Sequence, residues 1–161
     1  MNLSEQIAQL KKSTEESKAD LLKTFEFVPD EKLTWSPTES ARSPIWIVAH
    51  CGGANAAFAA ILRGEPLPMP EDPVEASAMI RNTGRDVQSR EEAVKSVEES
   101  TAALIAALDG VTEEMTNSMT PTPFGPMPFR MWMEVPAPHM SGHARQIDYI
   151  QTIWGDLQDH M

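Results

Sequence analysis

The sequence predicts an all-α fold, a four-helix bundle in a single domain spanning residues 1–161. Four stretches carry apolar side chains at the three- and four-residue spacing of a helix, and no stretch alternates convincingly as a strand would. The length suits one domain with a sizeable core. Because three connections are too long for tight turns, we expect a bundle with at least one crossover.

The first predicted helix covers residues 2–27. Asn2 and Glu5 have the spacing of a capping box at its start. Its apolar stripe is interrupted by Thr14 and Ser17, which fall on the same face. These small residues either allow close helix packing or border a polar cavity, and the packing interpretation is favoured.

The second helix is predicted over residues 44–63, after a proline-containing connection in which Trp35 is expected to anchor on the core. Ser43 and Pro44 mark its start, since serine is a favoured N-cap and proline suits the first turn. His50 falls about two turns into this helix, on the face that also carries Trp46 and Phe58.

A long connection over residues 64–88 follows, in which residues 74–80 are expected to form a short helix covering a pocket. The third long helix is predicted from Ser89 to Leu108, with a capping box formed by Ser89 and Glu92 and a stop at Gly110. Prolines dominate residues 120–128, which we expect to form an extended or hairpin-like excursion.

The last helical pattern runs from Phe129 to Gly155 and contains Pro136 and Pro138. Each proline removes a helical N–H and crowds the preceding turn, which predicts a kink or a new helix start just before His139. Residues 156–161, including His160, are expected to fray.

The composition narrows the possible functions. The net charge is −11 and the isoelectric point about 4.7, with no basic cluster, so broad nucleic-acid binding is not expected. Cys51 is the sole cysteine, which excludes an intramolecular disulfide and a thiolate-rich zinc site. The N-terminus lacks the pattern of a signal peptide, and residues 45–62 are too polar in places for a membrane span. We therefore expect a cytoplasmic protein with no membrane partner.

Three of the four histidines form a candidate metal site. His139 and His143 are four residues apart, which makes them neighbours on one helix face. Such a pair also arises by chance, and a lone histidine such as His50 is more often a core residue. Together, three inward-facing neutral imidazoles with one open position match a catalytic zinc site, and nickel or iron(II) would also accept them.

Other reactive side chains are interpreted as structural. Cys51 follows His50 and points about 100° away from it around a helix, so it is expected to be a small buried residue. The methionines at 127, 131, 133 and 140 are expected to be flexible core filler.

Three segments resemble the DinB/YfiT-like proteins over about residues 3–155: Ser43-Pro-Ile-Trp-Ile-Val-Ala-His50, His139-x3-His143-x2-Gln146-Ile147, and Leu33-Thr-Trp35-Ser-Pro37. The resemblance implies a bundle with up-down-down-up topology and a divalent metal held by His50, His139 and His143. It also implies a water or substrate at the metal, and dimers, which are common in the family. The chain departs from the family pattern at Pro136 and Pro138, and in Ala-Arg-Gln146, where Arg-Gly-Gln is commoner.

Family members of known activity are mostly thiol-dependent transferases or isomerases that use low-molecular-weight thiols such as bacillithiol or mycothiol. The resemblance therefore implies a metal-dependent S-transferase acting on small electrophiles. A metal-dependent hydrolase, a non-enzymatic metal-binding protein associated with stress, and a plain bundle with incidental histidines remain as alternatives.

Overall fold

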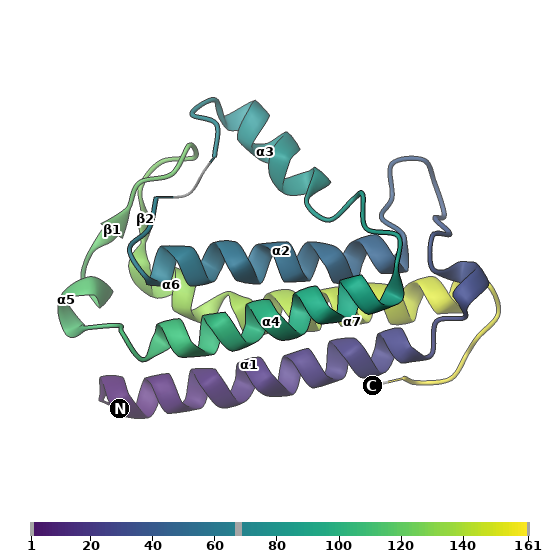
Figure 1. The fold of residues 1–161 in the computed structure, drawn as a ribbon, viewed down its shortest axis with the longest axis horizontal. Coiled ribbons are helices and arrows are strands. Elements are labelled where there is room, and N and C mark those ends of the chain that lie inside the picture. The colour runs from purple at the N-terminus through teal and green to yellow at the C-terminus, as the bar shows by residue number, and fades with distance from the viewer. Residues whose placement is uncertain (1, 67–68, 161) are drawn as a thin grey trace.

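The computed structural model describes residues 2–66 and 69–160 and is mostly helical. Four long helices lie lengthwise against one another: α1 (Leu3–Glu26), α2 (Pro44–Leu62), α4 (Arg90–Leu108) and α7 (Pro136–Ile153) (Figure 1). Helix α2 packs mainly on α4 and also on α7, while α1 packs on α7 and α4. The prediction of a mostly helical fold with four long helices is thereby confirmed, although the described residues also include one short pair of strands.

Shorter elements occupy the connections. They are the 3-10 helix η1 (Asp30–Lys32), α3 (Pro73–Asn82), α5 (Glu113–Thr116), the antiparallel pair β1 (Met119–Thr120) and β2 (Met127–Pro128), and α6 (Phe129–Glu134). The hairpin-like excursion predicted for the proline-rich segment is confirmed by β1 and β2. The short helix predicted in the connection after α2 is α3, which lies outside the four long helices (Figure 1).

Side-chain caps explain why several helices begin where they do. Asn2 and Glu5 form the predicted capping box at α1. The hydroxyl of Ser43 accepts a hydrogen bond from the Trp46 amide, and Pro44 occupies the first turn of α2. Asp72 caps α3 in the same way, ahead of Pro73. A serine or aspartate cap followed by proline satisfies free amides and presets the first backbone angle.

The prolines before the histidine pair start a new helix rather than distorting an old one. α6 ends at Glu134, and α7 begins at Pro136, which lies in its first turn together with Pro138. A residue in the first turn has no helical acceptor for its N–H, so a proline there removes no helical hydrogen bond. The His139 amide still bonds to the Val135 carbonyl at 3.0 Å, which places His139 within regular helix.

Small residues set how closely the long helices approach. Thr14 and Ser17 of α1 are buried, and the Ser17 hydroxyl lies 3.1 Å from that of Ser141 on α7. This confirms the packing interpretation of the interrupted stripe. On α2, a Cβ at Gly52 would lie 2.3 Å from the Ser96 hydroxyl oxygen, so only glycine fits against α4 there.

A buried amide ties three long helices together. The Asn55 Nδ2 of α2 donates to the Thr101 hydroxyl of α4 at 3.0 Å and approaches the Met140 sulfur of α7 at 3.2 Å. All three residues are fully buried. Because a buried amide without partners is costly, this contact fixes the register of α2 against α4 and α7.

The predicted fraying of the C-terminus is wrong for residues 156–160, whereas Met161 lies outside the described residues. The His160 ring is buried, stacks on Phe27 with centroids 4.3 Å apart, and bonds to Asp156 at 2.9 Å. The Thr24 hydroxyl donates to the His160 carbonyl. Sequence periodicity ends at Gly155, so it carries no signal for a tail held by the stacking and the hydrogen bonds of His160.

Within the described ranges, α2 is the one helix long and apolar enough to cross a bilayer by length and composition. However, 61% of that stretch is buried inside the fold, as expected for the core helix of a soluble protein.

Trp35 also anchors as predicted, with its ring edge-on to Trp154 at 5.4 Å.

Gly84, in the connection between α3 and α4, provides a test of close packing near His50. Its φ is +81°, and a Cβ there would lie 2.6 Å from the Ala49 carbonyl carbon and the His50 nitrogen. Gly64 has a similar φ of +73°, but none of the described residues has an atom within 4 Å of such a Cβ. Gly64→Ala should therefore lower the free energy of unfolding by about 1–2 kcal/mol, the cost of placing alanine in the left-handed conformation.

Gly84→Ala should lower the free energy of unfolding by the same strain and by about a further 1–3 kcal/mol, because the new Cβ would crowd the backbone of α2. Urea denaturation of both variants measures the difference in free energy of unfolding. Equal losses for the two glycines would show that the approach of this connection to α2 is not a packing constraint.

Candidate metal centre

Two helices bring the three predicted histidines together. His50 projects from the second turn of α2, and His139 and His143 project from the first two turns of α7. Their nearest potential ligand nitrogens all lie within 4.8 Å of one another, and the group contains no acidic side chain or cysteine. His50, His139 and His143 therefore form one cluster that could hold a metal ion.

The ring geometry suits a shared ion. The Nε2 atoms of His139 and His143 lie 3.2 Å apart. Two nitrogens each about 2.0–2.1 Å from a zinc ion are roughly 3.0–3.4 Å apart when their angle at the metal is between square and tetrahedral. The His50 ring centroid lies 5.2 Å from that of His139 and 5.1 Å from that of His143.

Gln146 orients one of the three rings. Its Oε1 lies 2.7 Å from the His143 Nδ1. An amide oxygen only accepts, so Nδ1 carries the hydrogen and Nε2 keeps a free lone pair facing His139. A hydrogen bond to the second ring nitrogen is the usual way in which proteins hold a ligating imidazole. The role of Gln146 was left open by the sequence, although its three-residue spacing from His143 on a helix contains the signal.

Burial keeps the cluster uncharged. It lowers the pKa of His50 to about 3 and of His139 to about 4, and it lowers the pKa of His143 as well. The positive charge of Arg42 and repulsion among the rings act in the same direction for His50. Neutral imidazole is the form that binds metals, so the ligands are in the required protonation state at neutral pH.

The cluster also leaves polar atoms without partners. The Nδ1 atoms of His50 and His139 are buried and make no hydrogen bond within the described residues. Burying a polar nitrogen unpaired is unfavourable by about 1–3 kcal/mol. The Nε2 atoms of His139 and His143 face each other at 3.2 Å, and an ion between them would accept a lone pair from each ring, so these residues fit a divalent metal.

An apolar cavity of about 660 Å³ opens beside His50 and His139. Its walls come from α2, α3, the β1–β2 excursion, α6 and α7, and include Phe58, Met79, Phe124, Met131 and Trp132. Helix α3 thus covers a pocket, as predicted. The core-filler interpretation is confirmed for the buried Met133 and Met140, whereas Met127 and Met131 line this cavity.

These features define a helical protein with a candidate three-histidine metal centre. The chain belongs to the DinB superfamily, whose family model matches residues 13–147. Among solved structures, Sibling Lethal Factor Precursor DfsB is similar to it, with a TM-score of 0.72 at 17% identity over 93% of this chain and 97% of that one. At this identity the likeness is one of fold. No match is found among the curated proteins.

Cys51 is buried as predicted and is not part of the cluster. Its side chain is inaccessible to solvent, and burial raises the pKa of its thiol to about 12. A raised pKa means that the reactive thiolate is scarce at pH 8. Native protein should therefore react with an aromatic disulfide reagent far more slowly than protein unfolded in guanidinium, which should release one equivalent of thiolate rapidly. Rapid reaction of the native chain would contradict the burial of Cys51.

Proposed function

We propose that this protein binds one divalent metal ion through His50, His139 and His143 and acts as a metal-dependent enzyme on a small molecule. The observation that carries the proposal is the neutral three-histidine cluster beside a large apolar cavity. Three nitrogen ligands leave one coordination position for water or substrate, as in catalytic zinc sites. The cavity volume falls within the range typical of small-molecule sites, about 300–1,000 Å³.

The donor set favours zinc or nickel, with iron(II) as a further choice. Imidazole is a ligand of intermediate softness that suits zinc, nickel and iron. The cluster lacks the carboxylates that magnesium or calcium would need. Gln146 would hold the His143 ring in place, and Phe58, edge-on to His139 at 5.9 Å, would limit its rotation.

The proposed reaction is S-transfer from a low-molecular-weight thiol to a small electrophile. When bound, the metal would favour the thiolate over the thiol. The sulfur would bond to the electrophilic carbon as the bond to the leaving group breaks, and the thiol proton would pass to solvent or to that group. Apolar walls would hold the electrophile and exclude water, which limits competing hydrolysis.

The proposal includes two further properties that the family resemblance implies, the up-down-down-up order of helices and a homodimer. It also includes a cytoplasmic location and no nucleic-acid or membrane partner, which are expected from the composition and charge of the sequence. A metal-dependent hydrolase would use the same open position for water.

Metal content tests the ligand set. Untagged wild-type protein should carry close to one divalent ion per chain by elemental analysis after dialysis. His139→Ala should retain far less, because two nitrogens hold zinc or nickel much more weakly than three. His160→Gln is the matched control: it removes a buried histidine remote in sequence from the cluster and should retain the ion. Unchanged metal content in His139→Ala would reject the site.

Cobalt substitution separates an enzyme that uses thiols from a protein that only stores or is stabilised by metal. Adding 2-mercaptoethanol, cysteine or bacillithiol to the cobalt form should change its visible spectrum as the open position is filled. His139→Ala loaded with cobalt provides the control for unspecific binding. An unchanged spectrum with every thiol would count against the transferase and favour the hydrolase or the non-enzymatic protein.

A further inference from the structure

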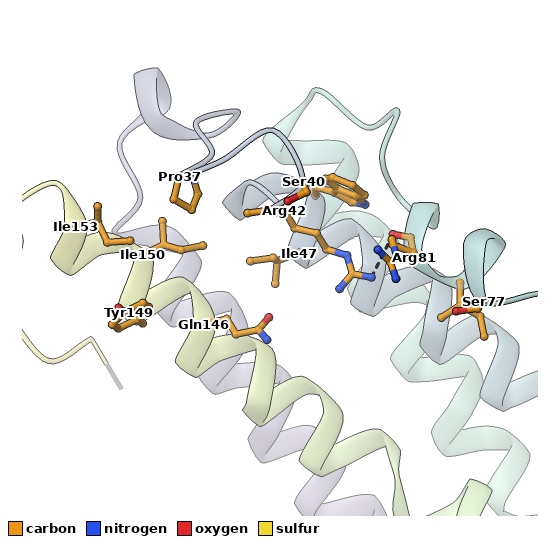
Figure 2. A pocket seen from close by; sticks show the side chains of 13 residues that line it. Pro37, Ser40, Arg42, Ile47, Ser77, Arg81, Gln146, Tyr149, Ile150 and Ile153 are labelled. Carbon is orange, nitrogen blue, oxygen red and sulfur yellow. Dashed lines mark hydrogen bonds between the residues drawn. The ribbon is translucent and has the colours of Figure 1, made fainter. Parts of the chain in front are cut away.

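A second cavity, of about 510 Å³, lies between residues 37–47, α3 and α7 (Figure 2). We call it the arginine pocket and define it by Arg42, Trp46, Ile80, Arg81, Gln146 and Tyr149. Figure 2 shows the Arg42 side chain extending among these residues toward Arg81, with Gln146 on the neighbouring helix. Neither the metal ligands nor the proposed S-transfer requires this pocket.

The pocket is positively charged in an acidic protein. Its 13 lining residues include two arginines and no acidic residue, whereas the whole chain has 24 acidic and 13 basic residues. Across the described ranges, no carboxylate forms an ion pair with Arg42 or Arg81. A partly buried arginine without a counter-ion leaves a local positive potential that favours an anion.

The Arg42 side chain is held in place and still has unpaired hydrogen-bond donors. Its Nη2 donates to the Arg81 carbonyl at 3.1 Å, and its guanidinium lies over the Trp46 ring at 5.7 Å from the centroid. Its Nε is buried and has no partner within the described residues. A guanidinium carries five N–H donors, so an acceptor from a ligand would satisfy groups that the protein leaves unpaired.

We propose that the arginine pocket binds a small organic monocarboxylate, with its carboxylate on the Arg42 guanidinium and its apolar part against Ile47, Ile80 and Ile150. One guanidinium edge matches the two oxygens of a planar carboxylate. The remaining walls are largely apolar, with side chains of isoleucine, tryptophan and tyrosine. Because a guanidinium also pairs bidentately with phosphate, the test includes a phosphate with the same alkyl chain.

The pocket adjoins the metal centre through Gln146. That side chain lines the arginine pocket while its Oε1 bonds to the His143 Nδ1 at 2.7 Å. Ile80 of α3 lines both the arginine pocket and the apolar cavity. The inference does not depend on metal binding.

The test is an NMR titration of metal-stripped, ¹⁵N-labelled full-length protein with hexanoate, 1-hexanol and hexyl phosphate. Trp46 lines the pocket and its indole N–H donates to the Thr83 carbonyl, and the three other tryptophans serve as internal references. Hexanoate should shift the Trp46 resonance saturably, and 1-hexanol at equal concentration should not. Omitting metal prevents the carboxylate from binding at the histidines instead.

Arg42→Gln should weaken hexanoate binding roughly 10- to 100-fold, the usual range for losing a charge-assisted hydrogen bond. Arg145→Gln, which removes an exposed positive charge from α7, should leave it unchanged. If Arg42→Gln unfolds, Ser77→Phe fills the pocket from the exposed face of α3 and should abolish binding.

Equal binding of hexanoate by wild-type and folded Arg42→Gln protein would overturn the proposal, as would the absence of any hexanoate response. Tighter binding of hexyl phosphate than of hexanoate would overturn the carboxylate assignment. Since all titrations are metal-free, a failure here leaves the metal proposal standing, and the reverse also holds.

Discussion

Three imidazoles buried against one another are the constraint on which this structure depends. Each neutral ring has one N–H and one lone pair, and the cluster provides too few partners to satisfy all of them. Protonation does not relieve the problem, because burial and the Arg42 charge lower the pKa of every ring. The fold therefore maintains an arrangement that is unfavourable without a ligand, and such local costs typically mark functional sites.

The surrounding packing holds this arrangement in place. Glycines on α2 allow α4 and the connection after α3 to approach its backbone, so His50 has little freedom to move away. The Asn55 contact with Thr101 and Met140 locks α2 against the helix that carries His139 and His143. The histidines are thus presented by rigid elements, as precise metal geometry requires. Helix α3 lies outside the four long helices and lines both cavities.

Much of the fold and of the histidine cluster could be predicted from the sequence, because these features depend on residues that are close together in the chain. Ser43-Pro44 and Asn2 with Glu5 determine helix starts through neighbouring atoms, and the four-residue spacing of His139 and His143 fixes their common face. The addition of His50 needed a long-range argument, and the family resemblance strengthened it. Arg42 and the buried His160 were missed because their roles depend on contacts with α3 and α1, which no periodicity encodes.

Two cavities with different linings lie beside one histidine cluster. The apolar cavity reaches His50 and His139, whereas the arginine pocket reaches His143 through Gln146. Since Ile80 contributes to both, a small movement of α3 would change the two cavities together. Helix α3 packs loosely against the long helices, with no extensive contact to any one of them. The two cavities therefore share part of one wall, and a substitution at Ile80 would alter both.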